Sequence, residues 1–202
     1  IIVNTGTFHL STYILTSGNI SIATNQSKTL DFGSSTITIA SAAPINFAST
    51  ESARANLTFI AGTSQINCSN ASPTISGNNQ IFYNVSFTGI LTGTATINGA
   101  NTFNNLSSTG ITSVGVKQLV LTANQTVTGA LTFSAGTNAT MRNFVRSDTI
   151  GTIRTITAAA FSGTDVDFRD ITIAGAAAPV SGTRIGDCKG NSGITFGAGV
   201  TR

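Results

Sequence analysis

The sequence predicts an all-β chain that folds as a right-handed parallel β-helix, a β-solenoid with turns of about 21–22 residues. Three observations support this prediction. Short runs of alternating apolar and polar residues recur along the whole chain. Only 8% of the residues are charged, whereas ordinary globular domains have about 25%. One block of sequence is repeated about 21 residues further along the chain.

The alternating runs are short and are separated by clusters of glycine, asparagine and serine. A period of two places one face of a strand in the core and the other face in water. No stretch has apolar residues at the spacing of an amphipathic helix. The clearest strand-like runs span residues 19–23, 36–39, 57–59, 119–121, 131–133 and 171–173.

The internal repeat relates residues 74–89 to residues 96–110. It aligns Phe82 with Phe103 and Asn84 with Asn105. A spacing of this size suits one solenoid turn, in which each strand pairs with its equivalent one turn away. We therefore expect the two phenylalanines to stack inside the helix. The two asparagines should form a ladder at a bend, where asparagine tolerates the left-handed conformation.

A third copy of the pattern begins at Phe168, 65 residues after Phe103. This alignment adds Phe168 to the phenylalanine ladder and places Asp170 at a bend. Right-handed winding follows from the usual rule for parallel crossovers. A β-sandwich is the main alternative, because short strands with frequent turns suit it too. We expect residues 1–202 to form a single solenoid domain, a segment of a longer chain, with residues 176–202 as a terminal loop or interface region.

Several motifs resemble those of repetitive β-helical proteins from tailed-phage virions and from bacterial surface adhesins. The likeness lies in residues 74–77 (Thr-Ile-Ser-Gly), residues 82–85 (Phe-Tyr-Asn-Val) and residues 126–133. Residues 165–172 and 186–196 resemble a stretch of large phage structural proteins, except that Lys189 stands where that stretch has glycine. The resemblance covers roughly residues 74–196. It implies a tail, fibre or decoration component of a virion.

A virion component of this kind would assemble with other virion subunits or with copies of itself. A host-surface glycan would be a further partner if the role includes attachment. A bacterial cell-surface adhesin or passenger domain, which would be extracellular, is the alternative. A carbohydrate-active β-helix enzyme ranks third, because most of the chain has almost no acidic residues. We therefore predict that the protein is not an enzyme.

The only dense acidic group consists of Asp165, Asp167 and Asp170. Paired carboxylates are the groups that glycoside hydrolysis requires. If the apolar residues between them face the core, however, Asp165 and Asp167 face solvent as a charged patch. We therefore expect no catalytic residue here. His9 is the only histidine and lies far from these acids in the sequence, so we expect a partly exposed structural residue.

The remaining features exclude several other functions. The net charge of +3 is spread thinly, without a basic run among aromatic residues, so nucleic-acid binding is not predicted. Cys68 and Cys188 have neither a metal-site spacing nor the pattern of a disulfide framework. The sequence does not decide whether a single long-range disulfide joins them. No apolar run approaches the roughly 20 residues of a membrane span. We expect no cofactor, no metal and no membrane insertion.

The two ends of the sequence are apolar or strand-like. Residues 1–3 are Ile-Ile-Val, and residues 195–202 continue a strand-like run without a polar cap. Uncovered strand edges and exposed apolar turns tend to associate. We therefore expect residues 1–3 and 192–202 to lie at contacts in the native assembly, covered by another subunit or by more of the same polypeptide.

Overall fold

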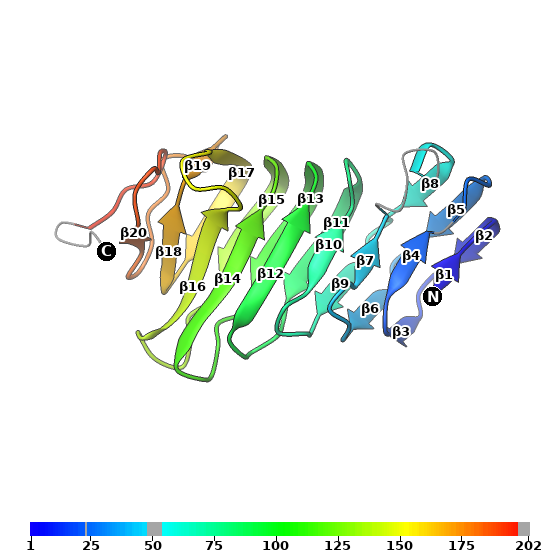
Figure 1. The fold of residues 1–202 in the computed structure, drawn as a ribbon, viewed down its shortest axis with the longest axis horizontal. Coiled ribbons are helices and arrows are strands. Elements are labelled where there is room, and N and C mark those ends of the chain that lie inside the picture. Colours follow the sequence, from blue (N-terminus) through cyan, green and yellow to red (C-terminus); the bar gives the residue numbers. More distant parts are fainter. Residues whose placement is uncertain (23, 48–53, 198–202) are drawn as a thin grey trace.

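The protein is a parallel β-helix, as the sequence predicts. The computed structural model describes residues 1–22, 24–47 and 54–197. Its strands stack along the long axis of the molecule, from the first turn at the right of Figure 1 to the last turn at the left. Every strand pairing within these residues is parallel, which excludes the β-sandwich.

The largest sheet, which we call sheet 1, contains nine strands in chain order. Each of its inner strands pairs with the equivalent strand of the turns before and after it, so each turn of the solenoid contributes one strand to this sheet. Its strands are β1 (Ile2–Val3), β4 (Ile20–Ile22), β7 (Ile45–Asn46), β10 (Thr74–Ser76), β12 (Gly93–Asn98), β14 (Gly115–Leu121), β16 (Met141–Ser147), β18 (Val166–Arg169) and β20 (Gly186–Asp187).

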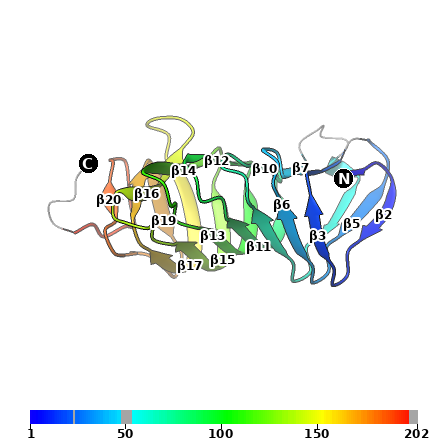
Figure 2. The ribbon, with the colours of Figure 1, turned by 90° about the horizontal axis from the view of Figure 1, so that it is seen from below.

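Sheet 2 contains eight strands and forms the layer opposite sheet 1 (Figure 2). Its strands are β3 (Ile14–Ser17), β6 (Thr36–Ile39), β9 (Gln65–Cys68), β11 (Ile81–Phe87), β13 (Asn101–Ser108), β15 (Gln125–Phe133), β17 (Arg154–Gly163) and β19 (Ile171–Ala174). Sheet 3 is confined to the N-terminal turns and contains β2 (Gly6–His9), β5 (Lys28–Asp31) and β8 (Leu57–Ile60). The cross-section therefore changes from three strands per turn to two.

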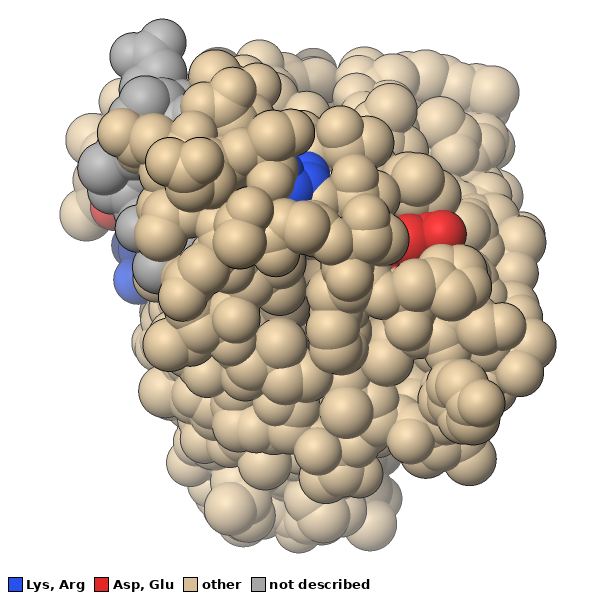
Figure 3. Space-filling model, turned by 90° about the vertical axis from the view of Figure 1, so that its right-hand side faces the viewer, with Lys and Arg blue, Asp and Glu red and all other residues tan. Residues whose placement is uncertain are grey.

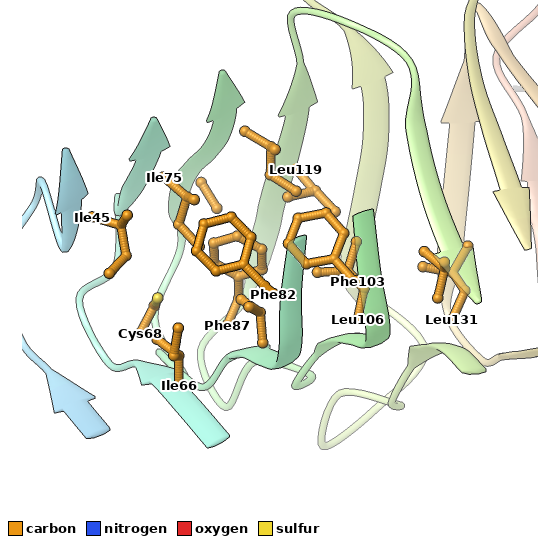
Figure 4. Close-up of a cluster of buried hydrophobic side chains, with 14 of the residues drawn as sticks. Ile45, Ile66, Cys68, Ile75, Phe82, Phe87, Phe103, Leu106, Leu119 and Leu131 are labelled. Atoms are coloured by element: carbon orange, nitrogen blue, oxygen red, sulfur yellow. The ribbon is translucent and has the colours of Figure 1, made fainter. Parts of the chain in front are cut away.

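The core lies between the sheets and is built from stacked, inward-facing side chains (Figure 4). Ile75, Ile97 and Leu121 are neighbours in register on sheet 1, and all three are fully buried. Phe82 pairs with Phe103 in sheet 2, and their rings stack with centroids 5.6 Å apart. This pair has the register that the sequence repeat predicts. A ladder of like side chains repeats the same favourable contact at each turn, which is how a solenoid builds a core from turns that cannot bury one alone.

The predicted position of Phe168 is wrong. Phe168 lies on β18 of sheet 1, where it pairs with Val145, whereas Phe82 and Phe103 lie on sheet 2. Its side chain is buried, so the apolar residue was correctly placed inside but on the opposite wall. A two-sided turn has two inward-facing strands of similar composition, and the sequence motif does not distinguish them.

Turn length also varies more than the repeat suggests. Phe103 follows its partner Phe82 by 21 residues, but Thr157 follows its partner Thr126 by 31. The strands must stay in register because they share a core, whereas the connecting loops lie outside and tolerate insertions. Residues 148–153, for example, form a loop between β16 and β17.

The strand-like run predicted at residues 195–202 is wrong for residues 195–197, the part that the structure describes. Residues 180–194 contain the short strand β20 and otherwise pair only through single parallel bridges, such as that of Val180 with Ile194. Residues 195–197 are not in a strand. Residues 198–202 lie outside the described part of the chain.

Candidate functional site

The acidic group is buried and ion-paired, which corrects the prediction of a solvent-facing patch. Asp165 has no exposed surface, and Asp167 is 8% exposed. The guanidinium of Arg142 donates to both carboxylate oxygens of Asp167, at 2.6 and 2.7 Å. Arg142 is itself buried and also donates to the Arg184 carbonyl. The prediction failed because a buried arginine lies on the neighbouring strand β16, which the local sequence around Asp167 does not indicate.

Asp165 is held by a second arginine. Arg184 donates to its two carboxylate oxygens at 2.6 and 2.8 Å, and Arg142 approaches one of them at 3.5 Å. Two carboxylates and two guanidinium groups therefore neutralise one another. Bidentate pairing occupies the oxygen atoms that an acid or a nucleophile would need, so the geometry favours a structural role over glycoside hydrolysis.

Asp170 lies at a bend, between β18 and β19, with a positive φ of 56°. Its carboxylate accepts a hydrogen bond from the Gly151 backbone N–H. Asn84 and Asn105 lie within strands β11 and β13, so their predicted place at a bend and their predicted equivalence with Asp170 are both wrong. The asparagine ladder itself exists: the Asn105 amide donates to Asn84 Oδ1 at 2.9 Å.

Lys117 is a buried cation that the sequence did not single out. Its side chain is 1% exposed and its Nζ donates to the carbonyls of Phe87, Gly89 and Thr109, at 2.7, 2.8 and 3.1 Å. Burial lowers the pKa of Lys117 to about 8, and burial raises the pKa of the nearby Cys68 thiol to about 12. These two groups lie inside the helix and have no access to a bulky substrate.

The remaining candidates for chemistry are scattered. His9 Nδ1 lies 2.7 Å from Asp31 Oδ2 on the neighbouring strand, and the histidine is exposed, as expected of a structural residue. Cys68 and Cys188 are not joined by a disulfide. Within the described residues, no group of three or more histidine, cysteine, aspartate or glutamate side chains could hold a metal. The same part of the chain has no helix long and apolar enough to cross a membrane.

The outer face of sheet 2 carries neutral polar side chains on nearly every strand. Arg154 is the only charged residue in its described strands. One row of side chains follows the strand register from the first turn towards the last: Thr16, Thr38, Asn67, Ser86, Ser107, Thr132 and Ser162. Two neighbours in this row bond directly: Ser86 Oγ lies 2.7 Å from Ser107 Oγ.

A hollow of about 390 Å³ lies over the first residues of strands β13, β15 and β17. Its floor holds three threonines in register, Thr102, Thr126 and Thr157. We call this hollow the threonine groove. Its lining residues are Asn79, Ala100, Asn101, Thr102, Asn124, Gln125, Thr126, Thr155 and Thr157.

A β-bulge lies beside the threonine groove. Strand β15 has three residues between Val127 and Leu131, where β13 has two between their partners Phe103 and Leu106. Strand β15 also has one residue more than β17 in the same region. A bulge bends its strand and increases the local twist, and bulges are common beside binding sites. Gly129 lies in the bulge, close to the Asn104 carbonyl and the Asn105 side chain.

The threonine groove is not among the sites that the sequence predicts. The signal was present, because Asn101-Thr102-Phe103 and Gln125-Thr126-Val127 are equivalent triplets on successive turns. The two triplets lie 24 residues apart, so the 21-residue spacing that relates Phe82 to Phe103 does not align them. No protein-family model matches the chain, and no curated protein or solved structure is significantly similar to it.

Proposed function

We propose that the protein is a non-enzymatic structural component of a virion, in which the β-helix acts as a rigid segment of a tail, fibre or decoration. The observation that carries this proposal is the continuity of the stack: nine parallel strands follow one another through sheet 1 without a break. Each strand of sheet 1 is hydrogen-bonded to the next, and the turns follow one another along the long axis (Figure 1). Such an architecture resists extension and bending, because any deformation must strain many backbone hydrogen bonds together.

The state of the ionisable groups supports a role without catalysis. Asp165 and Asp167 are saturated by Arg142 and Arg184. An active site instead needs groups that are accessible to a substrate and able to change protonation.

The virion assignment is supported by the phage-like stretch at residues 186–196, which covers the end of the solenoid. The Asn191 side chain donates to the Phe168 carbonyl and accepts from the Ile171 backbone N–H. Lys189 has a φ of 78°, a left-handed conformation that favours glycine. Lys189 is thus in the conformation expected where the resembled stretch has glycine, so the substitution leaves the turn intact.

Immunogold labelling tests the proposal. Antibodies raised against the purified chain should label phage particles produced by cells that carry its gene. Labelling confined to the surface of uninfected cells would overturn the virion assignment in favour of the adhesin. Release of reducing ends from a panel of polysaccharides by the purified chain would overturn the non-enzymatic part.

A further inference from the structure

We propose that the threonine groove is a binding site for a neutral saccharide. The inference goes beyond the structural role and does not rest on it, because a rigid segment could carry such a site in any assembly. The groove has the size of a ligand site, since small-molecule pockets typically enclose about 300–1,000 Å³. The chemistry of its walls selects the class of ligand.

The floor of the groove is fixed by buried amides that are already bonded. The Asn101 amide donates to the carbonyls of Asn98 and Gly99, and the Gln125 amide donates to those of Gly99 and Ala123. Both side chains are buried. They therefore hold the corner in shape without competing for a ligand, which is the arrangement that a pre-formed site requires.

The hydroxyl groups at the surface of the groove, by contrast, are not bonded within the described chain. The hydroxyls of Thr102, Thr126, Thr155 and Thr157 have no hydrogen-bond partner among the described residues. Asn124 accepts from the Thr155 backbone N–H through Oδ1, which leaves its two amide hydrogens unused. Each hydroxyl can both donate and accept. A ligand with many hydroxyls matches this mixture, since it also donates and accepts at every position.

The absence of charged residues in the groove excludes further classes of ligand. No lining residue of the groove is acidic or basic. Phosphate, sulfate or carboxylate ligands would lose hydration here without gaining a cation, and metal ions would find no carboxylate. No aromatic ring lines the groove, so a planar base would find no stacking partner.

A second hollow of about 260 Å³ continues from the first, because Thr126 and Thr157 line both. Its remaining lining is mostly apolar and small: Val127, Thr128, Ala158, Ala159, Gly175 and Ala176. A sugar ring has hydroxyls at its rim and C–H groups on its faces. The polar hollow can bond the rim of one ring, while the apolar shelf packs against the face of the next.

An extended peptide is a poorer occupant. Peptides that add to a sheet bind through the backbone groups of an edge strand. Strands β13, β15 and β17 are each paired on both sides, so their backbone groups are already used. Recognition in the groove must therefore proceed through side chains, and these are hydroxyls and amides.

Methyl NMR of threonine-labelled protein tests the inference. The probes are neutral hexasaccharides of glucose, mannose, galactose and N-acetylglucosamine, together with oligogalacturonate as a charged comparison. At millimolar concentration, at least one neutral probe should shift the methyl signals of Thr126 and Thr157 and leave Thr38 unchanged. Failure of every neutral probe to shift the groove signals, or a shift by oligogalacturonate alone, would overturn the proposal.

A pair of matched double variants locates the site. Thr126→Val with Thr157→Val removes two groove hydroxyls but keeps the β-branched shape, so the fold should persist. Affinity should fall about tenfold or more, since each hydrogen bond typically contributes a factor of about two to ten. The control, Thr132→Val with Ser162→Ala, changes partners on the same two strands outside the groove and should alter affinity less than about twofold. Equal losses in both variants would contradict the assignment.

Discussion

Lys117 has an environment unlike that of a surface lysine. Its ammonium is buried, and three carbonyl oxygens take its three hydrogens. The carbonyls of Phe87 and Gly89 come from the end of β11 and the bend that follows it, and that of Thr109 comes from the bend after β13. Lys117 thus ties two successive bends together. Without Lys117, the Phe87 carbonyl keeps its hydrogen bond from the Thr109 N–H, whereas the carbonyls of Gly89 and Thr109 lose their donor, which costs about 1–3 kcal/mol per group.

The depressed pKa of Lys117 predicts how stability depends on pH. Between about pH 8 and 10.5 the unfolded chain keeps a proton that the folded chain has lost. The contribution of Lys117 to the free energy of unfolding should therefore rise with pH in this window, by up to about 3 kcal/mol. Urea denaturation at a series of pH values should reveal this rise, and Lys117→Met should abolish it. The control Lys189→Met alters an exposed lysine and should keep the rise.

Cys68 should oppose this trend at higher pH. Its pKa is raised from 9.0 to about 12, so above pH 9 the unfolded chain loses a proton that the folded chain keeps. Stability should therefore fall from pH 9 upward on account of this residue. In Cys68→Ala the rise due to Lys117 should continue to about pH 10.5 instead of levelling off near pH 9. Superimposable wild-type and variant profiles would show that the thiol does not titrate as argued.

The pair Arg142–Asp167 should behave as a coupled unit. Asp167→Ala leaves the buried Arg142 guanidinium without its two best acceptors, so unfolding free energy should drop by about 3–5 kcal/mol. Replacing both residues, Arg142→Met with Asp167→Leu, removes the buried charge together with its partner. The double variant should be more stable than Asp167→Ala in urea denaturation. Additive losses would mean that the two side chains do not depend on each other.

Among the elements, the corners between sheets 3 and 2 repeat most closely. Ser11, Gly33 and Gly62 occupy the same corner on three successive turns, with φ between 54° and 57°. Each glycine packs against the corner residue of the turn before it. A Cβ added to Gly33 would lie 2.2 Å from the Ser11 carbonyl oxygen, and a Cβ added to Gly62 would lie 1.9 Å from the Gly33 carbonyl oxygen. A side chain is therefore tolerated at Ser11, below which no described turn lies.

Gly62→Ala tests this stacking. The substitution combines an unfavourable left-handed conformation with a backbone clash, so it should destabilise the protein by at least about 2 kcal/mol. Gly151→Ala is the control, because Gly151 also has a positive φ but nothing lies near its Cβ position. Thermal unfolding should separate the two variants, with the larger loss at Gly62. Similar losses would assign the whole effect to backbone conformation rather than to stacking.

The strands were predictable where the alternation and the repeat agreed. Thr74–Ser76 and Ile81–Phe87 pair with their predicted equivalents, since one turn separates each pair without an insertion. The assignment failed at Phe168, where a motif typical of one sheet occurs on the other. The local sequence determines which side chains of a strand face inward. Whether that strand belongs to sheet 1 or to sheet 2 depends on how the bends before and after it fold. The glycine corners could have been found, because Gly-Ser-Ser and Gly-Thr-Ser recur at residues 33 and 62.

On the scale of the molecule, the buried interior holds a group of charged side chains, whereas the outer face of sheet 2 is almost uncharged. Arg142, Asp165 and Asp167 are buried together, whereas the outer face of sheet 2 is nearly without charge. The sequence could not predict this ion-pair network, because Arg142 precedes Asp167 by 25 residues, a separation fixed only by the turn length. The threonine groove was missed for the same reason. Both sites are made by stacking distant segments, so only the register shows which residues come together.

The two ends of the solenoid differ. Residues 180–194 cross the C-terminal end, whereas β1, β2 and β3 each pair on one side only in the described chain. The N-terminal end face has few charged side chains (Figure 3). Ile2, Tyr13 and Ile14 are among its most exposed apolar residues, at 63%, 70% and 82%. Parallel strands with free edges bind further strands, and exposed apolar groups strengthen that association.

The 202-residue chain should therefore self-associate through its first turn. Ile14→Lys places a charge on the edge strand β3 without removing a core residue, since Ile14 is exposed. Lysine on an edge strand opposes pairing because its charge would have to be buried. Sedimentation velocity should give concentration-dependent oligomers for the wild type and a smaller fraction for Ile14→Lys. Ile150→Lys, in a loop far from this end and 76% exposed, should leave association unchanged. A monomeric wild type at every concentration, or an equal effect of both lysines, would show that the first turn is not an interface of this chain.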